Sequence, residues 1–373
     1  MIYLDCAATS LQKPFGVSSA VSRAMSTMAS PGRGCHRPAM LAADCILNCR
    51  MLLSSYFNVS EPENIIFTFN ATHGLNIAIN SLISEGNKVV ISGYEHNSVT
   101  RPLKALNADV CVAKSPLFNQ SATIEAFRQA LPGAKCAVCT HVSNAFGFIL
   151  PIQEISDNCR ELDIPLIIDA SQSAGTIPID YSALHAAFIA MPGHKGLLGP
   201  QGTGVLLCSN EAKPVLFGGT GSNSATSLMP EYLPDRLEAG THNVAGVAGL
   251  TQGVKFIMSK PKDTIFSHEK NLCAAFSNKI VGIPGLKLFF DDTMTAQSGV
   301  LSVMSNRLGS DELAERLGKV GICVRAGLHC APTAHETVGT IEEGTVRFSF
   351  SPFNTMSEVS FAADSLKKIL NTL

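Results

Sequence analysis

Charged residues are scarce in this 373-residue sequence: they make up 16% of it, and the formal net charge is −2. No basic field is present that could hold a nucleic acid backbone, and no basic amphipathic run indicates binding to a membrane surface. No apolar run reaches the roughly 18 residues that a membrane-spanning helix needs. The sequence therefore argues against nucleic-acid-binding and membrane-bound classes.

A secretion signal and a disulfide framework are also missing. The first residues, MIYLDCAATS, do not place a basic region before an apolar core. We therefore expect no export, a cytoplasmic location and reduced thiols. The twelve cysteines show no framework spacing, and most stand in apolar runs, such as Cys208 in GVLLCS and Cys323 in VGICVRAG. Most are predicted to be core residues.

Apolar residues, by contrast, are plentiful at 46%, and a chain of this length suggests about two domains. Short runs rich in Val, Ile and Ala predict buried strands at 88–92, 136–142, 165–170, 186–191 and 204–208. Helical patterns alternate with these runs at 74–83, 121–131 and 151–163. This alternation predicts an α/β fold, in which a large domain holds a mainly parallel, doubly wound sheet.

The pattern changes after about residue 240. A long helix is predicted at 244–258, followed by strands at 299–304 and 345–352 and by helices at 311–318 and 357–370. We predict a large domain of residues 16–250 and a smaller α+β domain formed by residues 1–15 and 251–373.

Polar side chains follow several of the predicted strands. In such sheets, functional groups gather just beyond the carboxyl ends of the strands. These positions hold His96, Asn144, Asp169, Gln172, His194 and Lys195. Taken singly, Asp169 is an ordinary helix cap and Lys195 a solvated loop residue. Together they match what pyridoxal 5'-phosphate needs, namely a lysine for covalent attachment and a carboxylate that keeps the pyridine nitrogen protonated.

A phosphate site is predicted in FNATHGLN, residues 69–76. Ala71, Thr72 and His73 are expected to precede a helix, so that their amides and the Thr72 hydroxyl can face an anion. A threonine at this position is also an ordinary N-cap, so this segment alone does not decide between the two interpretations.

Several blocks resemble known enzymes. PGHKGLLGPQGTGVL resembles the lysine motif of the class V aminotransferase-like enzymes, a fold-type I pyridoxal-phosphate group. EHNS, HVSNAFG, DASQSAG, EAGTHN and RAGLHCAP together resemble cysteine desulfurases and selenocysteine lyases, in the group with the Arg-x-Gly-x-His-Cys-Ala loop. Matching blocks run from YLDCAATS to RFSFSPFNT, so the resemblance covers essentially the whole chain.

The resemblance implies roles around the cofactor ring. Lys195 would carry the cofactor, and Asp169 would pair with its ring nitrogen. Gln172 would contact the phenolic oxygen, and His96 would stack on the ring and take part in catalysis. Asn144 would lie near the substrate.

The resemblance also implies roles for the phosphate and the substrate carboxylate. Thr72 and His194 would bind the phosphate, and Thr241 would reach the phosphate of a neighbouring subunit, which implies a homodimer. Arg347 would grip the substrate carboxylate, which suits a bidentate guanidinium. The family pattern has a small residue, often serine, where this chain has Pro192, so one phosphate contact is expected to be missing or replaced.

Cys330 stands apart from the other cysteines because its loop, RAGLHCAP, is bounded by glycine and proline rather than by an apolar run. Two residues close to Cys330 in the sequence, Arg325 and His329, could favour a reactive thiolate. Arg325 is also predicted to bind the substrate. The resemblance implies that Cys330 takes the sulfur of L-cysteine as a persulfide, leaving alanine, and passes it to an acceptor protein. Selenocysteine is an alternative substrate.

Two other interpretations compete with this one. A plain aminotransferase of the same fold would use Lys195 and Asp169 identically and leave Cys330 inert. A metal site could start from Cys136, Cys139 and His141, but a strand directs these two cysteines to opposite faces, and no second pair has suitable spacing. No metal is therefore expected.

Overall fold

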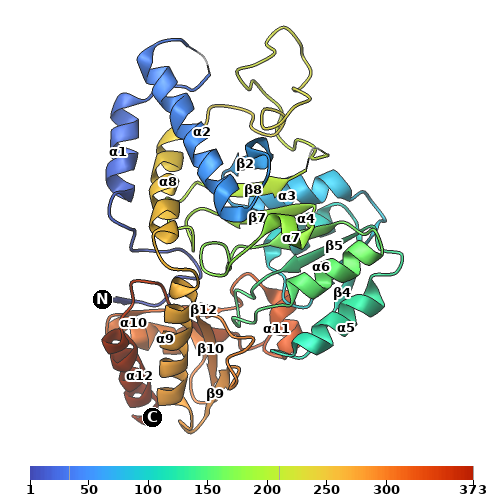
Figure 1. Cartoon of the computed structure of the whole chain (residues 1–373). Helices are drawn as coiled ribbons and strands as arrows, with labels where there is room; N and C mark the ends of the chain where they lie inside the picture. Colours follow the sequence, from blue (N-terminus) through green and yellow to red (C-terminus); the bar gives the residue numbers. More distant parts are fainter. Residues whose placement is uncertain (33, 210, 373) are drawn as a thin grey trace.

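The computed structural model describes residues 1–32, 34–209 and 211–372, which form the elements labelled in Figure 1. A seven-stranded sheet forms the centre of the larger part of the molecule. Its strands, in spatial order, are β2 (Ile65–Thr68), β8 (Gly204–Cys208), β7 (Phe188–Pro192), β6 (Leu166–Asp169), β5 (Cys136–Thr140), β3 (Lys88–Ser92) and β4 (Asp109–Ala113). The strands from β7 to β4 are parallel, while β8 is antiparallel to both neighbours. The predicted α/β fold with a mainly parallel sheet is confirmed.

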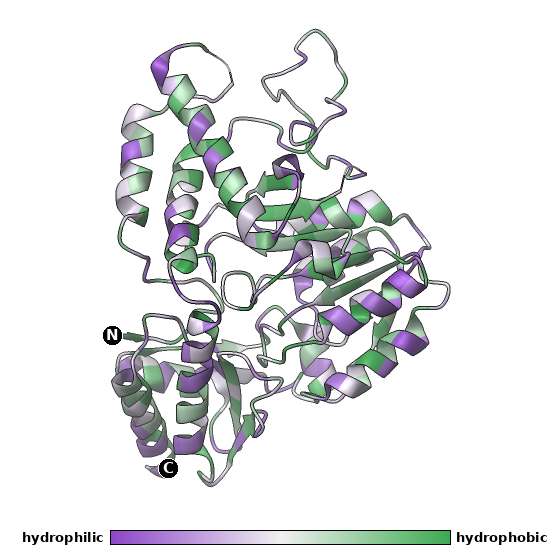
Figure 2. Ribbon diagram, in the orientation of Figure 1, coloured by the Kyte–Doolittle hydropathy of each residue, from purple (hydrophilic) through white to green (hydrophobic). Residues whose placement is uncertain are grey.

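Both faces of this sheet are buried, and Figure 2 shows its strands as largely hydrophobic. Successive side chains of a strand point to opposite faces. Ile167 accordingly packs in one core cluster and Ile168 in another. Cys136 and Cys139 are likewise divided between the two clusters as fully buried free thiols. No group of three or more His, Cys, Asp or Glu residues within the described ranges could hold a metal ion.

Helices cover the sheet on both faces (Figure 1). The helices of this part are α1 (Val17–Thr27), α2 (Arg37–Phe57), α3 (Ala71–Leu82), α4 (Asn97–Ala105), α5 (Gln120–Ala130), α6 (Ile152–Glu161), α7 (Tyr181–Leu184) and α8 (Val244–Met258), and a short 3₁₀ helix (Pro62–Asn64) precedes β2. Helices α1 and α2 pack against α8. Among the described residues, no helix is both long and apolar enough to cross a bilayer.

Helix α3 begins earlier than the sequence predicted. Asn70, not Thr72, caps it: the Asn70 Oδ1 atom accepts a hydrogen bond from the backbone N–H of His73 at 3.0 Å. Ala71, Thr72 and His73 therefore form the first turn rather than precede the helix. Gly74 lets this turn approach the sheet closely, because a Cβ there would lie 3.3 Å from the Cβ of Ala190 on β7.

A second, antiparallel sheet is built from the C-terminal part of the chain. Its order is β12 (Arg325–Gly327), β13 (Thr345–Ser349), β10 (Val300–Ser305) and β9 (Leu286–Phe289). The helices of this part are α9 (Thr264–Ile280), α10 (Ser310–Lys319), α11 (Pro332–Val338) and α12 (Met356–Asn371). Leu301, Val346 and Phe276 belong to a separate core cluster of this part. The domain boundaries stay a prediction, and α8 runs unbroken through residue 250.

The N-terminal segment lies along this second sheet. Strand β1 (Ile2–Tyr3) pairs in parallel with β11 (Ile322–Cys323), and Asp5 forms an isolated bridge with Ser349. Residues after Asp5 then reach the large sheet, where the Ser10 amide donates to the backbone oxygen of His194. The first residues of the chain therefore contact both sheets.

Candidate active site

A cavity lies beyond the carboxyl ends of the central strands, as expected for a parallel sheet. The residues that line it are Asn70, Ala71, Thr72, His96, Ser98, Thr140, Val142, Asn144, Asp169, Ser171, Gln172, Pro192, His194 and Lys195. The predicted cofactor residues except His73 and Thr241 are thus brought together.

Asp169 and Lys195 enter this cavity from adjacent strands. Asp169 is the last residue of β6, is 2% exposed, and accepts a hydrogen bond from the Ser171 amide at 2.9 Å. Lys195 follows β7. Burial and the positive charges of Arg347 and Arg325 lower the pKa of Lys195 to about 8, although Asp169 and Asp5 act in the opposite direction. The amine therefore loses its proton more readily than an ordinary lysine does.

His96 caps α4, and its Nδ1 atom accepts a hydrogen bond from the Ser98 amide at 3.0 Å. Because Nδ1 is the acceptor, the neutral ring carries its proton on Nε2. Burial lowers the pKa of His96 to about 4, so the ring is neutral near pH 7. The Ser98 hydroxyl lies 2.9 Å from this Nδ1 and 2.8 Å from the Thr72 hydroxyl. Ser98 was missed as a site residue, although it stands in the EHNS block.

The first turn of α3 forms one end of the cavity. The amides of Ala71 and Thr72 lie where a helix leaves N–H groups without intrahelical acceptors, and a helix N-terminus favours an anion. His194 contributes a ring whose Nδ1 lies 3.0 Å from the Thr9 hydroxyl. Burial lowers its pKa to about 4, so His194 offers a neutral ring here.

His73 and Thr241 lie in a different cavity, lined also by Phe69 and Glu238. The His73 ring stacks on Phe69 with centroids 4.8 Å apart. Thr241 is exposed and follows Glu238, a buried carboxylate that pairs with Arg50 at 2.9 Å. The structure therefore separates these two residues from the Lys195 cavity.

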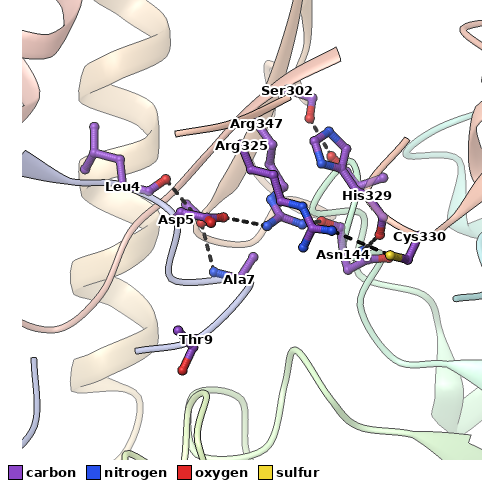
Figure 3. Close-up of polar contacts among 12 residues, drawn as sticks. Leu4, Asp5, Ala7, Thr9, Asn144, Ser302, Arg325, His329, Cys330 and Arg347 are labelled. Carbon is purple, nitrogen blue, oxygen red and sulfur yellow. Dashed lines mark hydrogen bonds and ion pairs between the residues drawn. The ribbon is translucent and has the colours of Figure 1, made fainter. Parts of the chain in front are cut away.

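Two arginines occupy adjacent strands beside the cavity. Arg325 on β12 and Arg347 on β13 are directly paired in the sheet. Arg347 is 1% exposed; it donates from Nη2 to Asp5 Oδ1 at 2.7 Å and from Nη1 to the backbone oxygen of Asn144 at 2.9 Å (Figure 3). Asp5 was not predicted as a site residue, although it stands in the YLDCAATS block.

Cys330 is exposed in the loop between β12 and α11, and Arg325 Nη2 lies 3.5 Å from its sulfur (Figure 3). His329 and Cys330 both have left-handed backbones, with φ of 51° and 56°. The loop is tied to the cavity, because Asn144 Nδ2 donates to the backbone oxygen of His329 at 2.7 Å.

The His329 ring does not assist the thiol as its position in the sequence suggested. Its Nε2 atom lies 3.0 Å from the Thr345 hydroxyl, and the ring is buried beside His335. Burial, with Arg347 as the next cause, holds the pKa of His329 well below its usual value. A neutral, buried imidazole contributes no positive charge to the Cys330 sulfur.

The arrangement combines an amine of lowered pKa, a buried carboxylate, a helix N-terminus and an exposed thiol beside an arginine pair. The family model described as aminotransferase class-V matches residues 2–361. The chain belongs to the class-V aminotransferase family.

Two of the most similar relatives are both named as probable cysteine desulfurases. The chain is 30% identical to a probable cysteine desulfurase of Methanothermobacter thermautotrophicus, covering 99% of this chain and 94% of that protein. It is also 30% identical to a probable cysteine desulfurase of Pyrococcus abyssi, covering 100% of this chain and 95% of the relative.

Solved structures of class-V aminotransferase relatives share the fold. The apo structure of a cysteine desulfurase from Thermococcus onnurineus superposes with a TM-score of 0.92 at 28% identity, covering 100% of this chain and 95% of that one. A cysteine desulfurase from Escherichia coli gives a TM-score of 0.86 at 24% identity, covering the same shares of the two chains.

Proposed function

We propose that this class-V aminotransferase is a pyridoxal-phosphate-dependent cysteine desulfurase that converts L-cysteine to L-alanine and retains the sulfur as a persulfide on Cys330. The observation that carries the proposal is the link through Asn144. This residue lines the Lys195 cavity, and its amide holds the backbone of His329, next to the exposed Cys330. This link supports a role for the Cys330 thiol as a nucleophile at the edge of a cavity suited to this cofactor.

The residues present fit pyridoxal phosphate. Lys195 supplies an amine, Asp169 a buried carboxylate, and the first turn of α3, with the hydroxyls of Thr72 and Ser98, supplies donors for a phosphate. When bound, the cofactor supplies an electron sink for negative charge at the substrate Cα. Asp169 would hold a proton on the ring nitrogen, and Gln172, whose Nε2 donates to the backbone oxygen of Ala7 at 2.9 Å, would face the phenolic oxygen.

Lys195 would hold the cofactor and then move the substrate Cα proton through its Nζ atom. A pKa of about 8 leaves roughly a tenth of this amine neutral at pH 7, far more than an ordinary lysine has, and general base catalysis needs the neutral form. The neutral His96 would offer a flat ring surface without bringing a positive charge next to the protonated ring nitrogen.

Arg347 would bind the substrate carboxylate, and Cys330 would attack the substrate sulfur. The Cβ–S bond of L-cysteine breaks while an S–S bond forms at Cys330 Sγ. L-cysteine and the Cys330 thiol thus become L-alanine and a Cys330 persulfide, with no other oxidant or reductant. The outer sulfur of the persulfide then passes to an acceptor, which breaks the S–S bond and restores the Cys330 thiol, and the exposure of Cys330 leaves access for that acceptor.

The proposal includes a homodimer and a cytoplasmic location. Thr241 is exposed and lies apart from the Lys195 cavity of its own chain, which supports a role at the phosphate of a second subunit. A reducing compartment keeps the Cys330 thiol available for attack.

Release of L-alanine tests the proposal. The purified protein, loaded with pyridoxal phosphate, is incubated with L-cysteine or L-selenocysteine, with and without a thiol reductant, and alanine is measured. We expect release from L-cysteine that rises with reductant, because reductant regenerates Cys330. Release from selenocysteine alone would instead indicate a selenocysteine lyase, and transfer of the amino group to a keto acid without alanine release would indicate a plain aminotransferase.

A further inference from the structure

Two guanidinium groups and one carboxylate meet at the second sheet. Arg325 and Arg347 are paired across β12 and β13, so their side chains project from the same face of the sheet. Asp5 reaches this pair from the N-terminal segment and accepts from Arg347 Nη2 at 2.7 Å. The three side chains therefore carry a net charge of +1.

Arg347 is held by a neutral and an acidic partner from two distant parts of the chain. Asn144 supplies a backbone oxygen, Asp5 supplies a carboxylate oxygen, and the Arg347 Nε atom is buried and unpartnered within the described structure. A buried guanidinium is costly without a counter-charge. Asp5 provides that counter-charge, because Asp5 Oδ1 and Arg347 Nη2 form an ion pair in which the Arg347 side chain is 1% exposed.

The negative charge of Asp5 also affects the pKa values of two nearby groups, Arg347 and Lys195. It raises the pKa of Arg347, and it opposes the effect of the two arginines on the pKa of Lys195. Arg325 in turn contacts the sulfur of Cys330. The cluster therefore contacts the cavity residue Asn144 through Arg347 and the Cys330 sulfur through Arg325.

We propose that Asp5 is a specificity-determining residue that limits this site to ligands with one carboxylate beside a neutral thiol. One incoming carboxylate neutralises the remaining charge of the Arg325, Arg347 and Asp5 cluster. A second anionic group near the sulfur then meets no excess positive charge and is repelled by Asp5. This role rests on the proposed function, since it assumes that Arg347 receives the carboxylate of the substrate.

A purely structural role for Asp5 makes a different prediction. Asparagine keeps an oxygen that can accept from Arg347 Nη2 but removes the negative charge, whereas alanine removes both. If Asp5 only positions Arg347, then Asp5→Asn should resemble the parent, and Asp5→Ala should weaken all carboxylate ligands equally.

The experiment compares two ligands that lack the amino group of cysteine, 3-mercaptopropionate with one carboxylate and mercaptosuccinate with two. Their dissociation constants are measured by calorimetry on the cofactor-loaded protein. For Asp5→Asn we expect the affinity for mercaptosuccinate to rise about tenfold relative to that for 3-mercaptopropionate. Asp5→Ser also replaces the carboxylate by a neutral side chain and should change the ratio of the two affinities in the same way. Asp5→Glu keeps the negative charge and should keep the affinity ratio of the parent.

Asp157→Asn is the matched control, because it neutralises an exposed acid 2.9 Å from Arg160 on α6. It should leave the ratio of the two affinities unchanged. An unchanged ratio in Asp5→Asn and Asp5→Ser, or an equal loss for both ligands, would overturn the proposal. If the ratio shifts but the parent releases no alanine from L-cysteine, the proposed desulfurase function fails while the charge role of Asp5 stands.

Discussion

The Nη2 atom of Arg325 lies 3.5 Å from the sulfur of Cys330 (Figure 3). This contact distinguishes Cys330 from Cys35, a second exposed thiol in the described structure. It places a permanent positive charge beside a sulfur that solvent can reach, and such surroundings are typical of reactive cysteines.

Replacement of Cys330 by alanine should retain the cofactor absorbance and the fold but reduce alanine release from L-cysteine by at least about a hundredfold. The attacking sulfur is then missing, although the Lys195 cavity is intact. Single-turnover alanine release and intact mass after exposure to cysteine measure the effect. Cys35→Ala serves as the control and should behave as the parent. Added sulfur on a thiol other than Cys330 would contradict the assignment.

Replacement of Lys195 by alanine should abolish covalent attachment of pyridoxal phosphate. Lys13 provides an internal comparison, because burial lowers its pKa to about 8 as well, yet it lies outside the cavity that holds Asp169. Borohydride reduction followed by peptide mapping identifies the labelled lysine in the parent. We expect the label on Lys195, and a label on Lys13 instead would refute the assignment.

Asp169→Asn should fold normally but lose most turnover, by about a hundredfold or more. The variant keeps an oxygen that can accept from the Ser171 amide, so the local turn survives. It has no negative charge to hold a proton on the ring nitrogen. The melting temperature and the rate of alanine release are measured together. A near-normal rate would show that Asp169 acts mainly as a cap.

Glu269 on α9 should make the protein less stable as the pH rises. Burial raises the pKa of this carboxyl to about 8 from an ordinary 4.5. Between these values the folded chain binds the proton and the unfolded chain does not, so the contribution of Glu269 to stability falls from pH 4.5 to pH 8. The difference in unfolding free energy between Glu269→Gln and the parent should therefore shift in favour of the variant, by on the order of 2 kcal/mol, between pH 4.5 and pH 8.5.

Denaturant unfolding at the two pH values tests this effect. The exposed Glu125, whose pKa is lowered by hydrogen bonds from Gln129 and Arg128, provides the control in Glu125→Gln. That variant should not reproduce the gain at high pH. If the difference in unfolding free energy between Glu269→Gln and the parent is the same at pH 8.5 as at pH 4.5, then Glu269 is solvated.

The fold and the gathering of the predicted residues in the Lys195 cavity could be largely predicted because parallel strands bring their carboxyl ends together. Asp169 and Lys195 are far apart in sequence, but each follows a strand whose apolar run is clear. The start of α3 was predicted one turn late, since Asn70 and Thr72 are both suitable caps and only the backbone decides between them. The orientation of the His329 ring could not be predicted, because His329 and Cys330 both have left-handed backbones. Neither residue type favours that conformation strongly enough to predict it from the sequence.

Asp5 was not predicted because its role depends on strands of only two residues. Residues 1–15 were predicted to join the smaller domain, but β1 and β11 are too short to show any periodicity, so nothing local indicates that Asp5 contacts Arg347. The cavity that holds His73 and Thr241 is also lined by Glu238, whose partner Arg50 is 188 residues away in the sequence, so no local pattern indicates it.

The pairing of Asp5 with Arg347 joins residues 342 positions apart. During synthesis, at about 5–20 residues per second, Arg347 emerges roughly 20–70 seconds after Asp5. Cys330 also appears near the end of this interval. The cluster of Asp5, Arg325 and Arg347 therefore stays unassembled on the ribosome until residue 347 has emerged, and the nascent protein acquires this cluster and the neighbouring Cys330 at nearly the same time.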